Sequence, residues 1–450
     1  MKIALVSPYD YAYPGGVGRH VAALAEQFRA VGHDVAIIVP GSSDDEPDPP
    51  APYLTDMSLR GLGLQGTRED DDDPRAPTIG DAPRNAPASG RPLDGVYRIG
   101  RVMPIPANGS VARITLSLRM VARVKRILAA ERFDVVHVHE PLMPALPPTV
   151  LRYSQAVNIG TFHAFRPSYY GYYSGRPLLR YFFNKLHGRI AVSRVALGYI
   201  SNYFPGSYAI IPNGVDLRRF RGDAPPIERY RDGKPNILFV GRWEKRKGLS
   251  YLIRAYEQVI REFPQARLLV AGPEGRHGRA YRAYAERHGL RNIAFIGRVS
   301  DEDLPRYYAA CDVFCAPSIS GESFGIVLPE AMASGKPVVT TDIEGYRQVV
   351  AHGESGLLVP PRDERALAGA LCQLLHNPAE RERLGANGRY AAQQYAWERV
   401  ANRVLTYYGE VLDGRASPDT GSRAAVSSQQ PAVSNQLSAV SNQQSTVGRE

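Results

Sequence analysis

The chain has 450 residues, of which 44% are hydrophobic, and it carries a formal net charge of +10. Its length predicts two or three domains with an ordinary globular core. Three cysteines (Cys311, Cys315 and Cys372) are too few for a disulfide framework and fit a reducing cytoplasm, and no Cys/His spacing is typical of zinc. No apolar run approaches the roughly 18 residues of a membrane-spanning helix, and Met1 to Pro8 does not have the pattern of a signal peptide. The positive charge favours a polyanion or a membrane surface as partner.

The first forty residues predict a βαβ unit with a glycine-rich first turn. A strand over 2–7 is followed by Pro14-Gly15-Gly16-Val17-Gly18, then by a helix with one apolar face and a second strand over 35–39. The turn has neither the Gly-x-Gly-x-x-Gly nor the Walker spacing, so it gives little support to a nicotinamide site. Its adjacent glycines allow the backbone to approach a ligand closely.

Residues 41–95 interrupt this unit. They contain nine prolines and twelve acidic residues against five basic ones, with the densest acidic run at 69–73. We interpret the segment as a disordered insertion, because such a composition does not supply a core. The acidic run could also bind a metal, but a solvated charge run is the simpler interpretation.

A basic helix is predicted over about 114–130, directly after Asn108-Gly109-Ser110-Val111-Ala112-Arg113. Its apolar stripe consists of Leu118, Val121, Ile127 and Leu128. Cationic side chains occupy another face of this helix: Arg119, Arg123, Lys125 and Arg126. That face is either the solvated side of a helix that covers a sheet or a surface that attracts anionic lipid.

Two further predicted strands, 134–141 and 158–162, lead into polar segments. His137 and His139 lie two residues apart, on the same side of their strand. His139, at the carboxyl end, could contact a substrate hydroxyl, although a histidine pair is more often structural. The tyrosine-rich loop over 169–173 could form a wall for an acceptor or simply pack on the surface.

A second α/β half begins after the turn at 212–216. We predict an N-terminal parallel-sheet domain over 1–213 and a C-terminal one over 214–395, followed by a helix over 396–412 that packs back on the first domain. The tail over 413–450 repeats a polar seven-residue unit with few large apolar side chains, which is typical of disorder. Ligand sites favour the cleft between two such halves.

The most informative stretch is 321–335, which contains Glu322 and Glu330. An apolar strand precedes it and helical spacing follows, so Glu322 should lie in a loop at a strand's carboxyl end and Glu330 early in the next helix. Ligands bind at this edge of parallel sheets. Carboxylates would repel a phosphate but accept hydrogen bonds from sugar and ribose hydroxyls. The simpler alternative is a helix whose first turn carries glutamate for dipole reasons.

Cationic partners for these glutamates occur in Gly241-Arg242-Trp243-Glu244-Lys245-Arg246-Lys247-Gly248, directly after a predicted strand over 236–240. Arg242 can bind a diphosphate through two parallel hydrogen bonds, and Lys247 adds a point charge. The alternative is a basic surface loop without a ligand.

Together these motifs resemble those of a large family of retaining GT-B glycosyltransferases, group 1 (family four). Its sequences carry two glutamates with seven residues between them. The resemblance covers about 1–40 and 95–412. It rests on the Gly15-Gly16-Val17 loop, His139-Glu140-Pro141, the 241–248 segment and the Glu322 to Glu330 stretch. Within the family the chain is most similar to the phosphatidyl-myo-inositol mannosyltransferases, through 108–113 and the basic helix after it. The acidic insertion and a shorter 242–247 loop depart from that pattern.

The resemblance implies two Rossmann-like, doubly wound parallel-sheet domains facing a cleft, and it implies roles for individual residues. The implied catalytic residues are His139, Arg242, Lys247 and Glu322. The implied donor-binding residues are Gly16, Arg242, Lys247, Arg298, Val299, Glu322, Ser323, Phe324, Gly325, Ile326 and Glu330. The implied acceptor-binding residues are Tyr9, Asn108, Ser110 and Arg113, and the implied membrane-binding residues are Arg119, Arg123, Lys125 and Arg126.

The resemblance also implies a retaining hexosyltransferase that needs no metal. The expected donor is GDP-mannose, and the expected acceptor is a phosphatidylinositol-type lipid or a glycan at the inner face of the cell membrane. Alternatives are a UDP- or ADP-sugar transferase for polysaccharide or glycolipid, an epimerase or hydrolase that converts donor without acceptor, and a non-catalytic binder of sugar nucleotide or nucleic acid. Nucleic acid is disfavoured because no known recognition module is present.

Overall fold

The structure of the chain is a computed structural model. It describes residues 1–10, 15–41, 92, 94–100, 102–107, 110–115, 120–164, 172–173 and 175–414, with only the backbone described over 103–107 and 110–114. The predictions for the 41–95 insertion and the 413–450 tail therefore lie almost wholly outside the described residues. Asn108 and Arg119 lie outside them as well.

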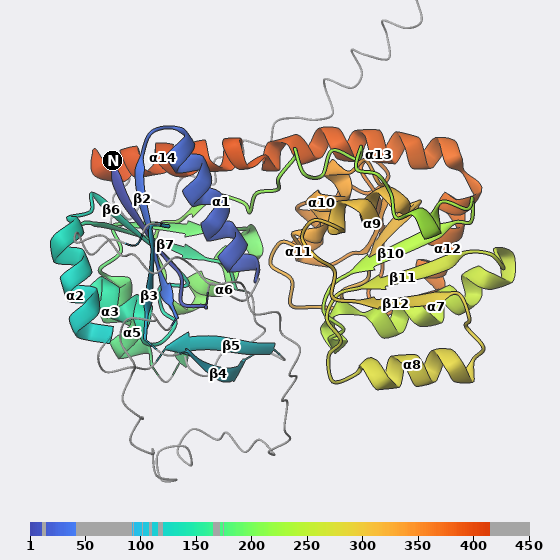
Figure 1. Cartoon of the computed structure of the whole chain (residues 1–450), viewed down its shortest axis with the longest axis horizontal. Coiled ribbons are helices and arrows are strands. Elements are labelled where there is room, and N and C mark those ends of the chain that lie inside the picture. The colour runs from blue at the N-terminus through green and yellow to red at the C-terminus, as the bar shows by residue number, and fades with distance from the viewer. Residues whose placement is uncertain are drawn as a thin grey trace, which may run out of the picture.

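Two parallel β-sheets, each covered by helices on both faces, form the two halves of the molecule (Figure 1). The first sheet has the strand order β3-β2-β1-β6-β7-β8-β9, and the second β12-β11-β10-β13-β14-β15. Within the described residues, all neighbouring strands of these two sheets pair in parallel. The predicted fold class, two doubly wound parallel-sheet domains, is confirmed.

In the first sheet, β1 and β6 lie at the centre and are buried because helices cover both of their faces. Continuous runs such as Ile3-Ala4-Leu5-Val6 suit this position. The strands are β1 (Lys2–Val6), β2 (Asp34–Pro40), β3 (Val96–Ile99), β6 (Val135–His139), β7 (Val157–Phe162), β8 (Gly188–Ala191) and β9 (Ala209–Ile210). The helices of this half are α1 (Gly16–Ala30), α2 (Met120–Glu131), α3 (Leu146–Tyr153), α5 (Arg176–Phe183) and α6 (Arg194–Tyr203).

The second sheet repeats the same plan. Its strands are β10 (Asn236–Val240), β11 (Arg267–Ala271), β12 (Ile293–Gly297), β13 (Val313–Ala316), β14 (Val338–Thr341) and β15 (Leu357–Val359). Its helices are α7 (Leu249–Glu262), α8 (Gly278–Arg287), α9 (Leu304–Ala310), α10 (Val327–Ala333), α11 (Glu344–Arg347), α12 (Glu364–His376) and α13 (Pro378–Ala392). Short 3-10 turns also occur in this part of the chain: η2 (Glu228–Tyr230), η3 (Lys245–Lys247) and η4 (Gln393–Tyr395).

One predicted element is wrong. The helix expected from about Ile114 starts only at Met120, because 110–115 form the strand β5 (Ser110–Thr115), antiparallel to β4 (Val102–Ala107). Asn108-Gly109 is a favoured hairpin turn sequence, and this local signal outweighs the helical spacing of the residues that follow it. In α2 itself, Met120, Val124 and Ile127 are the buried apolar positions.

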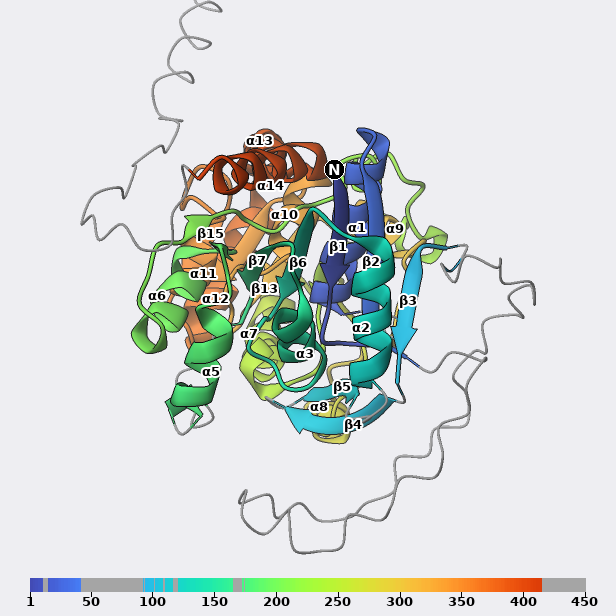
Figure 2. The same ribbon diagram turned by 90° about the vertical axis from the view of Figure 1, so that its left-hand side faces the viewer.

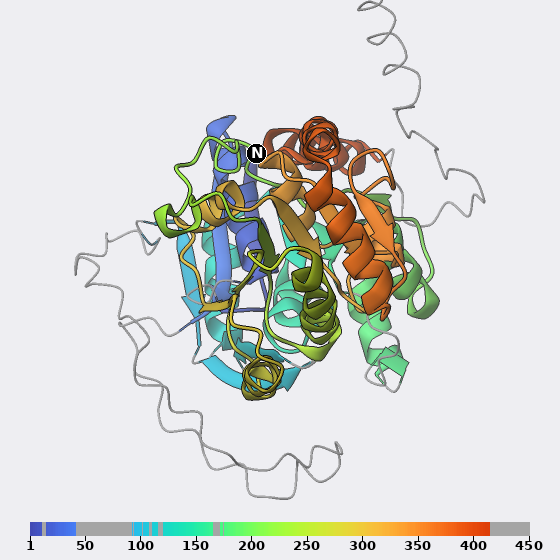
Figure 3. The ribbon, with the colours of Figure 1, turned by 90° about the vertical axis from the view of Figure 1, so that its right-hand side faces the viewer.

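The last helix, α14 (Trp397–Leu412), belongs to the first half, although it follows the second half in the chain. In Figure 1 it continues the line of α13 across the top of the molecule, and in Figure 3 the red helices of this line are seen roughly end-on at the top. Val400, Val404 and Tyr408 of α14 share a core cluster with α1 and strands of the first sheet. Among the described helices, none is long and apolar enough to cross a membrane.

Candidate active site

Glu322 lies in the loop between β13 and α10, with its side chain 9% exposed. One of its carboxylate oxygens, Oε1, is 2.8 Å from Lys247 Nζ and 2.5 Å from Arg246 Nη1. The sequence predicts Lys247 as a cationic partner of the glutamates from its place after a predicted strand. In the structure Lys247 and Glu322 form a direct ion pair at the carboxyl ends of two adjacent strands, β10 and β13.

A glycine allows this ion pair to form. Gly248, directly after the η3 turn, has φ +73°, and a Cβ atom there would lie 1.8 Å from the carbonyl oxygen of Pro317. Only glycine lets the turn that carries Arg246 and Lys247 pack this closely against the chain leaving β13. The cations thereby come within reach of the next loop.

A row of alternating charges continues outward from Glu322. The Glu244 carboxylate forms ion pairs with Arg246 Nε at 2.8 Å and with Arg242 Nε at 3.1 Å. The row therefore contains three cations and two carboxylates, and Arg242, with a side chain 48% exposed, lies at its outer end. One net positive charge remains to meet an anionic ligand.

Burial by itself would raise the pKa of Glu322, but Lys247 and Arg246 outweigh it and hold this pKa below its usual value. For Arg246, burial opposes the charge, yet the carboxylates of Glu322 and Glu244 raise its pKa. Both members of the pair are therefore charged at neutral pH. An ionised carboxylate accepts hydrogen bonds but cannot donate one, which suits a site for hydroxyl groups.

Glu330, in α10, has a different environment although it is equally buried. Its Oε2 accepts a hydrogen bond from the Tyr308 hydroxyl at 3.0 Å. Burial raises the pKa of Glu330, while Arg19, the Tyr308 hydroxyl and Arg219 partly oppose that shift. The two glutamates thus differ: Glu322 is paired with cations, and Glu330 is held mainly by a neutral hydroxyl.

A buried histidine cluster lies at the carboxyl ends of the first sheet. His139, at the end of β6, stacks on His137 (ring centroids 4.3 Å apart) and on His163 (5.2 Å), and His20 of α1 meets it edge-on. His139 Nδ1 is 2.9 Å from His163 Nε2, whereas its Nε2 has no hydrogen-bond partner. Burial is the main cause that lowers the pKa of each of these four histidines, so all are neutral at pH 7.

Glu140 fixes the geometry of this cluster. It follows β6 with φ +50°, an uncommon conformation for a residue other than glycine, and its side chain is buried. Its Oε1 accepts hydrogen bonds from the backbone N–H groups of His163 and Ala164, both at 2.7 Å. The segment after β7 is thereby tied to the end of β6, which places His163 beside His139.

The two halves meet at these groups. The Ser323 hydroxyl donates a hydrogen bond to the carbonyl oxygen of His163 at 2.7 Å, although the two residues are 160 positions apart. A Cβ atom on Gly16 would lie 3.5 Å from Ile326 Cδ1. Arg19 Nη2 is 2.5 Å from Asp301 Oδ1. The glycine loop, the histidine cluster and the Glu322 loop therefore lie where the two halves contact each other.

The remaining predicted residues are dispersed. Phe324 is buried against Tyr395, so its side chain is part of the core, and Gly325 and Ile326 lead into α10. Arg298 and Val299 follow β12, and Arg298 is exposed. Tyr9 lies after β1, where its N–H contacts Ser7 Oγ at 3.2 Å. Ser110 and Arg113 are in β5, with side chains outside the described part of the structure.

The structure adds residues that the sequence analysis did not select: His20, His163, Arg246, Tyr308 and Asn213. His20 Nδ1 is 3.0 Å from Asn213 Oδ1. Its position could have been inferred, because it lies four and eight residues before Leu24 and Phe28, on the buried stripe of α1. No sequence signal pairs Tyr308 with Glu330, because they come from different helices.

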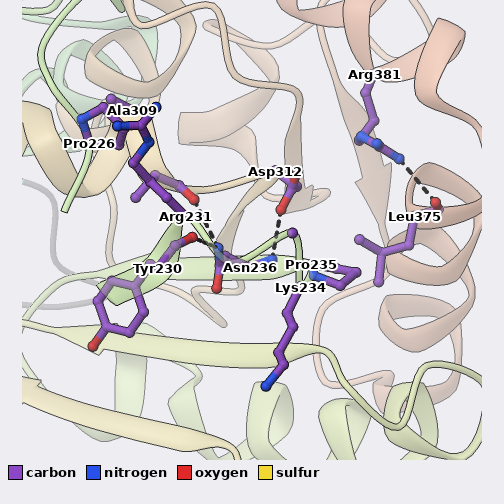
Figure 4. Close-up of a pocket in the computed structure, with 12 residues that line it drawn as sticks. Pro226, Tyr230, Arg231, Lys234, Pro235, Asn236, Ala309, Asp312, Leu375 and Arg381 are labelled. Atoms are coloured by element: carbon purple, nitrogen blue, oxygen red, sulfur yellow. Dashed lines mark hydrogen bonds between the residues drawn. The ribbon is translucent and has the colours of Figure 1, made fainter. Parts of the chain in front are cut away.

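A separate cavity of about 350 Å³ lies at the amino ends of the strands of the second sheet, where β10 begins (Figure 4). It is lined by Tyr230, Lys234, Asn236 and Asp312, among others. The Asn236 N–H donates to Asp312 at 2.7 Å, and the Asn236 side chain donates to the carbonyl oxygen of Tyr230 at 2.9 Å. These polar groups satisfy one another at the amino ends of the strands, away from the Glu322 cluster.

Family models match both halves of the chain. The model of the glycosyl transferases group 1 matches residues 221–391, and that of glycosyltransferase family 4 matches 14–219. A phosphatidyl-myo-inositol mannosyltransferase of Mycobacterium leprae is 35% identical over 430 residues, which cover 95% of this chain and 100% of that protein. The chain belongs to the group 1 glycosyltransferases. It is a hexosyltransferase that uses a nucleotide-sugar donor, as the family resemblance implied.

Solved structures share the fold of this chain. Sucrose-phosphate synthase from Thermosynechococcus elongatus has a TM-score of 0.67 and 24% identity, over 92% of this chain and 99% of that one. The Anabaena protein HepE, in complex with UDP and glucose, has a TM-score of 0.66 and 17% identity, over 91% of this chain and all of that one. At these identities the likeness supports the fold of the glycosyltransferase, not its substrate.

Proposed function

We propose that this glycosyltransferase transfers mannose from GDP-mannose to the inositol ring of a phosphatidylinositol-type lipid, with retention of the anomeric configuration. The observation that carries the proposal is the full-length match to a protein named phosphatidyl-myo-inositol mannosyltransferase. The ion-paired Glu322 cluster facing a histidine cluster supports it, because the two supply acceptors for hydroxyls and cations for a diphosphate.

In the proposed reaction the bond between the anomeric carbon and the diphosphate oxygen breaks, and its electron pair leaves with the nucleoside diphosphate. Lys247, Arg246 and Arg242 stabilise the negative charge that develops there. No metal ion is required for this role. Arg246 extends the donor set beyond the residues selected from the sequence. The acceptor hydroxyl forms its bond to the anomeric carbon on the same face, and its proton passes to the leaving diphosphate.

The remaining groups bind and orient the substrates. Glu322, kept ionised by its cations, accepts hydrogen bonds from the sugar, and Glu330 accepts them from the ribose. Backbone N–H groups from Ser323 to Ile326 and the loop at Gly16 approach the phosphates, and the chain at Arg298-Val299 meets the base. The neutral ring of His139, with an unpartnered Nε2, lies where it can bond a sugar hydroxyl.

The acceptor lipid is proposed to lie on the first half, near Tyr9, Asn108 and the strand β5, which contains Ser110 and Arg113. The enzyme would bind peripherally at the inner face of the cell membrane. Support comes from α2, where Lys125 and Arg126 are exposed and Arg123 is half-buried. Each such cation near an anionic surface contributes about 1 kcal/mol.

A transfer assay with a panel of donors and acceptors tests this proposal. With GDP-mannose and phosphatidylinositol we expect a mannosylated lipid whose anomeric configuration, read by NMR, equals that of the donor. Turnover with UDP- or ADP-sugars but not GDP-mannose would overturn the donor. Conversion of donor without any acceptor product would instead indicate an epimerase or hydrolase.

A thermal-shift series with GDP, UDP and ADP separates binding from turnover, because a ligand that binds only the folded state stabilises it more, at a given concentration, the lower its Kd. We expect GDP to raise the melting temperature most. A Glu330→Gln variant should weaken the effect of each nucleotide that carries ribose hydroxyls. Equal stabilisation of wild type and variant would remove Glu330 from the ribose site.

A further inference from the structure

A set of exposed apolar side chains, here called the patch, lies on the first half, outside the active-site groups. Seven large hydrophobic side chains of the described residues are exposed, and three of them fall within nine positions: Tyr173 (75% exposed), Leu178 (66%) and Tyr181 (49%). The other four are scattered along the chain: Met1, Val31, Tyr390 and Leu412. Leu178 and Tyr181 both belong to α5.

The fold does not require these side chains to be apolar. The opposite side of α5 is held by Phe182 and Phe183, which are buried in the core of the first half, with Leu179 packed against it. Leu178 and Tyr181 are three positions apart and thus on one outward face. A surface helix usually carries polar residues on such a face, so this one is suited to an apolar partner.

Positive charge surrounds the patch. Arg176 and Arg180 of α5 are exposed, and Lys185 Nζ lies 5.3 Å from the centre of the Tyr181 ring. The sequence from Pro141 to Val215 contains seven Lys or Arg and no Asp or Glu. A partner for this surface must therefore be both apolar and anionic.

The patch lies in the same group of packed helices as the cationic face of α2. Helix α2 packs on α3, and α3 packs on α5. Figure 2 shows these three helices together on the end of the molecule that faces away from the C-terminal half. Across this end, Lys125 of α2 lies 4.4 Å from the centre of the Tyr153 ring of α3, next to the exposed Arg152.

We propose that α5 and Tyr173 form a hydrophobic anchor that inserts into an anionic lipid surface, while the cations of α2, α3 and α5 contact its headgroups. The inference rests on the proposed action at a membrane and adds the element that enters the apolar region. Leucine and tyrosine flanked by arginine and lysine have the composition of an interfacial surface. Long cationic side chains can reach headgroups while their stems lie against the acyl region.

Tryptophan placed in the patch reports insertion directly. We would compare Leu178→Trp with Tyr390→Trp in the full chain; Tyr390 is 55% exposed on α13 of the other half. With vesicles of phosphatidylglycerol and phosphatidylcholine that carry brominated chains, Leu178→Trp fluorescence should shift to the blue and be quenched. The wild-type protein gives the background fluorescence of Trp243 and Trp397. The added tryptophan of Tyr390→Trp should not be quenched. Binding to vesicles without quenching at Leu178→Trp would overturn the proposal.

Charge placed in the patch tests its contribution to affinity. Leu178→Glu and Tyr181→Glu should each lower the affinity for these vesicles, measured by co-sedimentation, about tenfold. A loss of this size corresponds to the free energy of burying one apolar side chain. Tyr390→Glu should leave it unchanged. An equal loss in all three variants would overturn the anchor, as would a wild-type dimer in analytical ultracentrifugation that Leu178→Glu converts to monomer.

Transfer to phosphatidylinositol dispersed in detergent separates this inference from the proposed function. We expect Leu178→Glu to retain wild-type turnover in micelles, because its side chain lies outside the donor and acceptor groups. If wild type transfers no mannose under any condition, the proposed function fails while the quenching result still decides the anchor. If turnover is normal and quenching is absent, only the anchor fails.

Discussion

At the scale of single residues, the two glutamates of the family motif have opposite electrostatics. Glu322 contacts Lys247 and Arg246 and has a lowered pKa, whereas Glu330 contacts the Tyr308 hydroxyl and has a raised one. The pair is therefore not a matched acid and base. Each carboxylate lies in a different electrostatic environment.

Replacing either member of the buried ion pair should abolish transfer. Glu322→Ala removes the carboxylate that Lys247 and Arg246 share, and Lys247→Ala removes a charge from the proposed site of the leaving group. We expect turnover to fall by about a hundredfold or more, as for loss of one charge-stabilising group. Circular dichroism checks the fold, and Lys336→Ala, a lysine bonded to the Ala309 carbonyl, is the control. Wild-type turnover in a folded Glu322→Ala protein would refute the assignment.

The histidine cluster should make stability depend on pH. His20 has a pKa of about 4 in the folded chain, lowered by burial, against 6.5 for an ordinary histidine. The unfolded chain therefore binds more protons, so stability is complete above pH 6.5 and is lost as pH falls from 6.5 towards 4. Each tenfold difference in proton affinity between the folded and unfolded chain corresponds to about 1.4 kcal/mol of unfolding free energy.

Urea unfolding at pH 7.5 and pH 5 measures this effect. His20→Gln should lose less stability between the two pH values than wild type, because one buried proton acceptor is gone. His288→Gln, at an exposed histidine, should keep the wild-type difference. Identical pH dependence in wild type and His20→Gln would show that the cluster does not control it.

At the scale of elements, the turn into α10 depends on a glycine. Gly325 has φ +80°, and a Cβ atom there would lie 2.4 Å from the ring of Tyr346, whose hydroxyl bonds Ser318 at 2.7 Å. These contacts hold the loop that carries Glu322 against the second half.

Gly325→Ala should therefore destabilise the chain by more than about 1–2 kcal/mol, which is the cost of a left-handed alanine alone. Gly289→Ala provides the matched control, because Gly289 has φ +63° and a Cβ atom there would have no neighbour within 4 Å. The difference in urea midpoints between the two variants isolates the clash with Tyr346. Equal losses in both variants would mean that the loop adapts at no cost.

The cationic face of α2 should govern long-range attraction to membranes. Replacing Arg119, Arg123 and Arg126 by Gln should weaken binding to anionic vesicles and reduce its dependence on salt, because screened charges lose their effect first. Binding to neutral vesicles is the control and should not change. Unchanged co-sedimentation with anionic vesicles would exclude this face from the membrane contact.

At the scale of the whole molecule, the chain returns to its first half through α14. Tyr408 is fully buried there, and its hydroxyl is 2.6 Å from His137 Nδ1, 271 positions earlier. The last helix is therefore part of the packing behind the histidine cluster, and it joins the two halves covalently at a second place.

Tyr408→Ala should destabilise the first half by about 3–5 kcal/mol, the usual cost of removing a large buried aromatic side chain. If the halves unfold separately, urea unfolding followed by fluorescence should show two transitions, and the variant should shift that of the first half to a lower urea concentration. Leu412→Ala, at a side chain 44% exposed on the same helix, is the control and should change little. A small effect of Tyr408→Ala would mean that α14 packs loosely.

The sequence by itself determined the fold class and the Glu322 motif, because apolar periodicity and the loop after β13 are local patterns. It also placed Lys247 and Arg242 after a strand, although the pairing of β4 with β5 was not predicted. Only the tertiary structure decided that Arg246 binds Glu322, that His20 and His163 surround His139, and that Ser323 meets His163. These contacts join residues from different strands and halves, and their distances follow from sheet order and packing, which no local pattern encodes.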